Sequence, residues 1–176
     1  MIPQNKEQLN KEPETRTLVR FGDCDPLSHL NNARYLDYFL NAREDHLLHH
    51  YGLSTMQIAK ETGKTWVVTE NRIAYLRPAN LMEEIIIQST VIEVAAKRLI
   101  VEMRMYNEDK TQLKSVLWVT LVYFDTRTQR SAEHDGELAT FLRNLETPIP
   151  KNTTFEKRIG RLKEETKARA EAVPAS

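Results

Sequence analysis

Residues 20–36 read RFGDCDPLSHLNNARYL and contain the passage from the first predicted strand to the longest predicted helix. Gly22, Asp25 and Pro26 give the first half of this stretch the composition of a turn. Pro26 fixes its own φ angle and disfavours the helical conformation at the residue before it. We therefore predict that Asp25 is a loop carboxylate, presented rigidly just ahead of the helix.

The helix itself is predicted to run from about Asn31 to Tyr51. Asn31 or Asn32 can serve as its N-cap, and Gly52 is a residue type that commonly follows the last helical turn. Apolar residues recur along it at steps of three and four, which defines one face of a helix. The residues predicted to form this face are Leu36, Leu40, Leu47 and Tyr51, with Arg43 between them.

Most of the remaining chain has the alternating pattern of β-strands. Strands are predicted at about 14–22, 65–76, 84–95, 98–107 and 113–125, with a short helix near 54–61 and an amphipathic stretch near 138–145. The links between the later strands are short, and short links favour antiparallel neighbours because parallel pairing needs a long crossover. The predicted fold class is α+β, with one long helix packed across an antiparallel sheet.

The segment 84–95 carries large apolar residues on both faces of its strand. One helix covers only one face of a sheet, so we expect the other face to be covered by further structure or by a second chain.

Length and composition exclude several classes of protein. A chain of 176 residues fits one domain, and its 25 basic and 25 acidic residues leave no excess charge for nucleic acid or an anionic membrane. No apolar run approaches the roughly 20 residues of a membrane span. The single cysteine, Cys24, excludes an intramolecular disulfide framework. We expect a cytoplasmic protein.

Three regions are predicted along the chain. Residues 1–13 are polar and expected to form a flexible N-terminal arm, and residues 14–150 form the folded domain. Residues 151–176 are charged and have few large apolar residues, so they are predicted to be a helical or disordered tail that buries little surface. On this basis the tail is expected to be dispensable for folding and activity.

Residues 20–36 resemble the signature of the 4-hydroxybenzoyl-CoA thioesterase family of hotdog-fold acyl-CoA thioesterases. The resemblance rests on Asp25 at its distance before the run HLNNARY, residues 29–35, and on RIAYLRPA at residues 72–79. It covers about residues 14–126. The chain departs from the family at Ser28, where a Gly is common, and at Asn41, where a Glu is common.

This resemblance implies a hotdog fold, in which a five-stranded antiparallel sheet wraps a long central helix. It also implies homodimers with active sites at the interface, and a small-molecule acyl-CoA substrate. A homotetramer is the alternative assembly that we expect. Coenzyme A would be part of that substrate, so no separate cofactor is expected. The substrate-binding residues that we assign on this basis are Tyr35, Glu70, Lys97 and Arg98.

Thioester hydrolysis needs an activated water or a nucleophile, and hydrogen-bond donors for the oxyanion that develops on the carbonyl. Asp25 matches the family's catalytic carboxylate and can either attack the carbonyl or act as a general base to water. Free amides of the first helical turn, near Asn31 and Asn32, can donate to the oxyanion. His29 is the remaining candidate catalytic residue and would orient the substrate.

Lys97 and Arg98 form the best local basic cluster for the phosphates of coenzyme A, at a predicted turn between two long strands. The same pair could equally be the solvated tip of a hairpin. Glu70, on the strand before, is expected to face the site of a partner chain.

Alternatives remain at several positions. Asp25 could only shape a turn, in which case the chain would be a non-catalytic hotdog module that binds acyl thioesters or partner proteins. Asp37, one to two turns into the helix, is the reserve carboxylate. Cys24 is not expected to be a nucleophile, because the acidic residues beside it would raise its pKa. Three histidines follow in the helix, and a polar helix end explains them better than a metal site, so no metal is predicted: His46, His49 and His50.

Overall fold

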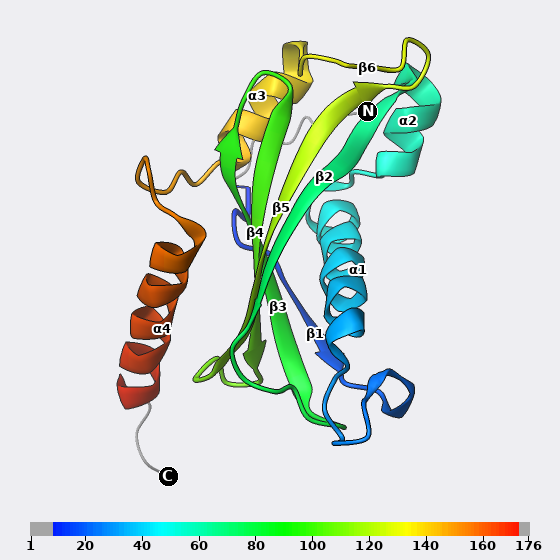
Figure 1. Cartoon of the computed structure of the whole chain (residues 1–176). Helices are drawn as coiled ribbons and strands as arrows, with labels where there is room; N and C mark the ends of the chain where they lie inside the picture. Colours follow the sequence, from blue (N-terminus) through cyan, green and yellow to red (C-terminus); the bar gives the residue numbers. More distant parts are fainter. Residues whose placement is uncertain (1–8, 173–176) are drawn as a thin grey trace.

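The structure is a computed structural model that describes residues 9–172, in which one antiparallel sheet lies between helices (Figure 1). The elements in chain order are β1 (Glu14–Leu18), a 3-10 turn (Phe21–Asp23), α1 (Asn32–Tyr51), α2 (Thr55–Thr62), β2 (Lys64–Tyr75), β3 (Glu84–Val94), β4 (Arg98–Asn107), β5 (Leu113–Asp125), β6 (Arg130–Ser131), α3 (Gly136–Leu145) and α4 (Phe155–Ala172). No helix within residues 9–172 is long and apolar enough to cross a membrane.

Five strands form the body of the sheet in the order β1-β3-β4-β5-β2, and every neighbouring pair is antiparallel. The two-residue strand β6 is an addition that pairs with the end of β5. Helix α1 lies along one face of the sheet, and α4 lies on the opposite side (Figure 1). The predicted α+β hotdog architecture is confirmed, and the boundaries of β2 to β5 agree with the prediction to within one residue.

Helix α1 begins and ends at the predicted residues. The side chain of Asn31 accepts a hydrogen bond from the amide of Ala33, which satisfies one of the free donors of the first turn. Gly52 follows the last turn with φ 60°, a left-handed conformation that glycine adopts without steric cost.

The buried face of α1 differs from the predicted one. Tyr35, Phe39, Ala42 and His46 are buried, whereas the predicted Leu36, Leu40 and Leu47 are only half-buried. The two stripes are one residue apart and therefore about 100° apart around the helix. Packing the aromatic stripe on the sheet removes more apolar area from water, and sequence periodicity cannot choose between two such stripes. Tyr51 is buried, as predicted.

The C-terminal segment departs most from expectation, because α4 is packed on the outer face of the sheet. Phe155 and Leu162 are buried there, and the ring of Phe155 meets Trp118 of β5 edge-on with centroids 5.2 Å apart. Residues 155, 159 and 162 are spaced by four and three, so even three large apolar residues make a continuous stripe. The expectation that the tail buries little is wrong.

A buried ion pair also joins α4 to the sheet. Glu102 of β4 is fully buried and accepts two hydrogen bonds from Arg158, from Nε at 2.9 Å and from Nη2 at 2.8 Å. Trp118 donates a further bond to the same carboxylate at 3.0 Å. This helix therefore provides, from within the same chain, part of the cover that the second face of the sheet requires.

The end of the predicted N-terminal arm is also held in place. Residues 1–8 lie outside the described residues, but Pro13 is buried and Leu9 packs against the core. Tyr51 donates to the carbonyl of Asn10, and Glu12 pairs with Arg104 at 2.8 Å. For residues 9–13 the prediction of a flexible arm is wrong.

His46 gives the fold a dependence on pH. Its ring is fully buried, and Nδ1 lies 2.8 Å from Ser89 Oγ, which also accepts from Arg43 at 3.2 Å. Nε2 has no hydrogen-bond partner among residues 9–172. Burial, and after it the charge of Arg43, lowers the pKa of His46 from 6.5 to about 4.

We expect the free energy of unfolding to fall as the pH drops from 6.5 towards 4. In this window the unfolded chain binds a proton at His46 that the folded chain does not, and the integrated loss is on the order of 3 kcal/mol. Urea denaturation at pH 7.5, 6 and 5, with His46→Gln as the comparison, measures the part of this loss that falls above pH 5, about 2 kcal/mol. Any slope from His134, whose pKa burial also lowers, remains in both proteins. An equal slope in the variant would contradict the assignment to His46.

Candidate active site

The turn before α1 is organised by the carboxylate of Asp25. Its Oδ1 accepts hydrogen bonds from the amides of Leu27 at 2.9 Å and His29 at 3.1 Å, and its own amide donates to the His29 carbonyl at 2.8 Å. Oδ2 accepts no hydrogen bond from residues 9–172. One oxygen of Asp25 therefore shapes the turn, and the other is available for chemistry.

The backbone conformation at Ser28 explains why glycine is common at this position in the family that the sequence resembles. It has φ 61°, in the left-handed region where a side chain is strained. The turn keeps this conformation here with a serine, and the Ser28 carbonyl accepts from Leu81 at 2.9 Å.

The first turn of α1 leaves one amide free. The Asn31 amide donates to the carbonyl of Asp23 at 2.9 Å, and the Ala33 amide is capped by the Asn31 side chain. The Asn32 amide has no acceptor among the described residues. The prediction that Asn31 supplies a free amide is wrong, because a residue of the preceding turn occupies it. The Asn32 amide has the positive end of the helix dipole behind it.

Asp25, His29 and Asn32 line one open hollow of about 260 Å³ at the N-terminal end of α1. Its opposite wall is the segment 75–78 at the end of β2, which includes Tyr75 and Arg77. The structure thus brings together a carboxylate with one uncommitted oxygen, a histidine and an unpaired helix amide.

A buried lysine holds the segment that follows this wall. Lys114 of β5 is 2% exposed, and its ammonium donates to the carbonyl of Pro78 at 2.8 Å and pairs with Glu83 at 2.7 Å. The amide of Ala79 donates to the hydroxyl of Tyr35 at 3.1 Å, and its carbonyl accepts from Leu30 at 2.8 Å. The loop opposite Asp25 is therefore fixed at several points.

The four predicted substrate-binding residues are not together. Tyr35 borders the hollow, but it is buried and its hydroxyl supports Ala79. Glu70 lies exposed on β2, outside the hollow. Lys97 and Arg98 lie at the β3–β4 turn, at the other end of the sheet from the turn of Asp25 (Figure 1), and Arg98 pairs with Glu93 at 2.6 Å. Within one chain, neither basic residue borders the hollow.

Two residues of the hollow were not among the site residues assigned from the sequence. Tyr75 donates a hydrogen bond to the carbonyl of Asn32 at 3.0 Å, which fixes the first helical turn against β2. Arg77 is exposed and supplies the one basic side chain of the Lys/Arg type among the lining residues. The signal was the stretch RIAYLRPA, which supported the resemblance but was not interpreted as part of a site.

The other carboxylates near the turn have partners elsewhere. Asp23 accepts from the hydroxyl of Tyr38 at 2.9 Å, and Asp37 is exposed and paired with Arg34 at 3.1 Å. Neither lines the hollow. The thiol of Cys24 donates to a backbone carbonyl at 3.3 Å, and its pKa is raised by desolvation and then by the two neighbouring aspartates.

The three histidines of α1 do not converge on one point. His46 is buried on Ser89, while the other two are exposed at the last turn. Within residues 9–172, no group of three or more His, Cys, Asp or Glu side chains is arranged to hold a metal ion.

An antiparallel sheet wrapped on one long helix is the hotdog fold, and the groups at the start of that helix are compatible with thioester hydrolysis. The model of the thioesterase-like superfamily matches residues 19–147, and the chain belongs to this superfamily. It is therefore a thioester hydrolase, and the resemblance found in the sequence is confirmed.

Relatives agree with this classification. The long-chain acyl-CoA thioesterase FadM of Escherichia coli strain K12 is 30% identical over 75% of this chain and 98% of its own. The crystal structure of YbaW, a probable thioesterase from Escherichia coli, shares 29% identity and a TM-score of 0.67 over 76% of this chain and 98% of that one. A mutant 4-hydroxybenzoyl-CoA thioesterase with bound 4-hydroxybenzoyl-CoA shares the fold, with 14% identity and a TM-score of 0.67 over 76% and 99%.

Proposed function

We propose that the chain hydrolyses acyl-CoA thioesters to the free acid and coenzyme A, with Asp25 as the catalytic carboxylate. The observation that carries the proposal is that Asp25 Oδ2 and the Asn32 amide, both without partners among the described residues, line the same hollow. The relative FadM, a long-chain acyl-CoA thioesterase by name, supports coenzyme A as the thiol.

In the proposed reaction the thioester carbonyl oxygen accepts a hydrogen bond from the Asn32 amide. The oxyanion is stabilised there by the amide and by the helix dipole. As a general base, Asp25 takes a proton from water, the water oxygen bonds to the carbonyl carbon, the C–S bond breaks and the thiolate receives the proton. As a nucleophile, Asp25 attacks the carbonyl carbon, the C–S bond breaks and the thiolate of coenzyme A leaves, which gives an anhydride between Asp25 and the acyl group. Water then hydrolyses the anhydride to the free acid and the Asp25 carboxylate, and the proton that is released goes to the thiolate. The geometry is compatible with both routes.

Substrate contacts are assigned by position. Arg77 borders the hollow and is the candidate for the phosphates of coenzyme A, while His29 is the candidate for orienting the thioester. Lys97, Arg98 and Glu70 keep their proposed roles only if a second chain brings them to the hollow. We place the reaction in the cytoplasm, since the chain has one cysteine and an acyl-CoA substrate.

The assembly we propose is a homodimer joined through β2. This strand ends the sheet, so one side of its backbone has no strand partner among residues 9–172. Residues 68–72 are exposed, with Val68 at 45%. Long bare edges of this kind are sites for pairing with another strand. An antiparallel β2–β2 pair would place Tyr75 of one chain near Lys64 of the other, so the hollow of each chain would adjoin its partner. A homotetramer is the alternative assembly.

Light scattering at micromolar concentration is expected to give the mass of two or four chains. We expect this association because the edge of β2 is free. An uncovered outer face is not the reason, since α4 covers part of that face. Val68→Asp, which puts a charge on that edge, should shift the protein towards the monomer. A monodisperse wild-type monomer would contradict the proposed interface.

The proposed activity is tested by thiol release from a panel of acyl-CoAs, comparing the wild-type chain with Asp25→Asn. Absence of release from every member of the panel would refute it.

A further inference from the structure

The loop of residues 76–83, which joins β2 to β3, is paired with the second half of the turn before α1. His29 and Asn80 form an isolated antiparallel bridge between the two segments. The amide of Leu81 donates to the carbonyl of Ser28 at 2.9 Å, on one side of this bridge. The conformation of the turn therefore depends on where the loop is held.

A β-bulge in β5 holds the start of this loop. Leu113 and Ser115 lie opposite two successive residues of β4, so Lys114 between them is the extra residue of the bulge. Bulges redirect a side chain and are common beside active sites. The backbone carbonyl of Lys114 accepts the amide of Leu76 at 2.8 Å and that of Arg77 at 3.1 Å, just where β2 ends. The backbone of the bulge thus fixes the first two residues of the loop.

The side chains of Lys114 and Glu83 hold the rest of the loop. The ammonium that donates to the carbonyl of Pro78 at 2.8 Å also lies 2.7 Å from Oε1 of Glu83. The second oxygen of Glu83 accepts from the backbone amide of Asn80 at 2.8 Å. The lysine side chain is 2% exposed and that of the glutamate 20%. One ion pair therefore ties Pro78 and Asn80 to the last residue of the loop.

Stability alone does not explain an ion pair in this place. Removing two charges from water is costly, and packed apolar residues of similar volume often give equal or greater stability. Precision is the better reason, because a catalytic group on a loop needs support from the residues behind it. Here the amide of His29, which donates to Asp25 Oδ1 at 3.1 Å, belongs to the residue that is bridged to Asn80.

We propose that Lys114 and Glu83 are positioning residues for the reaction. They hold the loop of residues 76–83, and the loop keeps the Asp25 carboxylate in place relative to the Asn32 amide. Neither side chain lines the hollow of Asp25, so neither contacts the reacting atoms. The inference rests on the proposed thioester hydrolysis and adds to it two residues that act through the loop.

The test replaces the pair by an uncharged one, Lys114→Met combined with Glu83→Gln. No charge is left unpaired, and the glutamine oxygen can still accept from Asn80, so the protein should fold. Because the bond to Pro78 is lost, kcat for acyl-CoA should fall by about 10- to 100-fold. KM should change by less than roughly threefold, since the backbone of residue 114 still holds the amide of Arg77. The same acyl group on N-acetylcysteamine, which has no nucleotide, should show the same fall in kcat.

The matched control is Glu102→Gln combined with Arg158→Met, which makes the same exchange at the buried ion pair on the outer face of the sheet. It should leave both kcat and KM unchanged, and urea denaturation checks that each double variant is folded in the assay. An equal loss of kcat in the two double variants would overturn the proposal. A KM that rises while kcat stays the same would also overturn it, because the pair would then act on binding alone.

Amide hydrogen exchange follows the loop without any turnover. The amides of Leu30 and Leu81, which donate between the turn and the loop, should exchange at least about tenfold faster in the Lys114 and Glu83 double variant than in the wild type. Faster exchange there, with no hydrolysis of any acyl-CoA by the wild type, would support the hold of the pair on the turn and refute the proposed function. Wild-type hydrolysis with an unchanged kcat in the double variant would overturn the positioning role and leave the proposed function intact. Rapid exchange of both amides in the wild type would overturn it even if the double variant did not fold.

Discussion

Asp25→Asn is expected to lower kcat for acyl-CoA hydrolysis by at least about 100-fold, the low end for loss of a positioned general base. An asparagine oxygen can still accept the amides of Leu27 and His29, which Oδ1 of the aspartate holds at 2.9 and 3.1 Å. The turn should therefore persist, while the uncommitted oxygen no longer accepts a proton or attacks a carbonyl. Thiol-release kinetics measure the loss, and thermal unfolding checks that the fold is kept.

Asp37→Asn is the control for this experiment. Asp37 is exposed in the first part of α1, and its pair with Arg34 spans 3.1 Å, so the pair contributes at most about 1 kcal/mol. We expect its turnover to stay close to that of the wild type. If Asp37→Asn abolishes turnover while Asp25→Asn does not, the catalytic carboxylate is on the helix. If neither variant loses activity, Asp25 only shapes the turn.

Arg158→Met is expected to destabilise the protein by about 3 kcal/mol, the low end for breaking a buried ion pair. Glu102 is fully buried, and without Arg158 it retains only the bond from Trp118 at 3.0 Å and the guanidinium of Arg104 at 3.7 Å. For a chain of this size the melting temperature should fall by about 6–12 °C. Thermal and urea unfolding measure the effect.

Two variants separate the ion pair from the rest of α4. Arg161→Met changes an exposed arginine of the same helix and should alter stability by no more than about 0.5 kcal/mol. Glu102→Gln combined with Arg158→Met removes both charges but keeps an acceptor for Trp118, and it should recover much of the lost stability. Equal melting temperatures for Arg158→Met and Arg161→Met would show that the pair does not hold α4 on the sheet.

The α4 contacts also change the expected effect of removing the tail. The composition predicts that the tail is dispensable, whereas the contacts predict that its removal destabilises the fold. Deleting residues 151–176 would remove the Arg158 partner of Glu102 and would uncover Trp118 and Leu113 on the outer face. The apolar spacing at 155, 159 and 162 is visible in the sequence. Its partner surface is not, because that surface is assembled from β2, β4 and β5.

Local patterns in the sequence determined the elements and the turn. Pro26 placed Asp25 outside the helix, and Asn31 and Gly52 marked the two ends of the helix. The alternation of apolar residues located β2 to β5. Each of these signals acts within a few residues. The motif around Asp25 also pointed to the family that the comparisons confirm.

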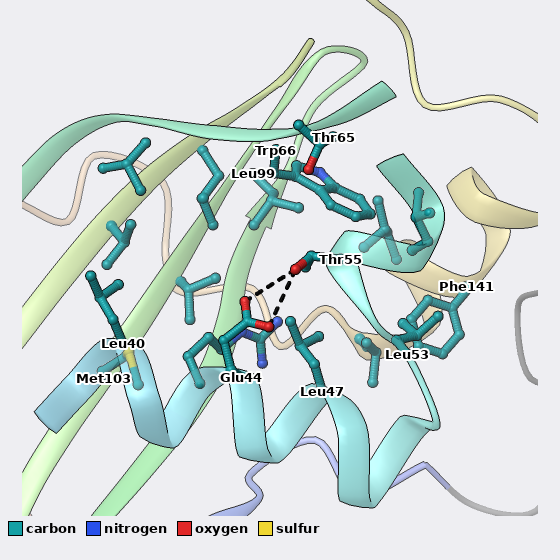
Figure 2. Close-up of a pocket in the computed structure, with 18 residues that line it drawn as sticks. Leu40, Glu44, Leu47, Leu53, Thr55, Thr65, Trp66, Leu99, Met103 and Phe141 are labelled. Carbon is teal, nitrogen blue, oxygen red and sulfur yellow. Dashed lines mark hydrogen bonds between the residues drawn. The ribbon is translucent and has the colours of Figure 1, made fainter. Parts of the chain in front are cut away.

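The tertiary structure decided which of these groups are free and which are engaged. The carbonyl of Asp23 accepts the Asn31 amide, so the Asn32 amide is the one left without a partner among the described residues. The sheet packs against the aromatic stripe of α1 rather than the leucines. Glu102 pairs with Arg158, which is 56 positions away in the sequence. The cavity that Leu40, Trp66 and Phe141 help to line (Figure 2) likewise forms only in the folded chain, because its walls come from α1, α2, α3, β2, β4 and β5. Hydrogen-bond partners and empty space are set by groups distant in sequence, and periodicity within one segment carries no information about them.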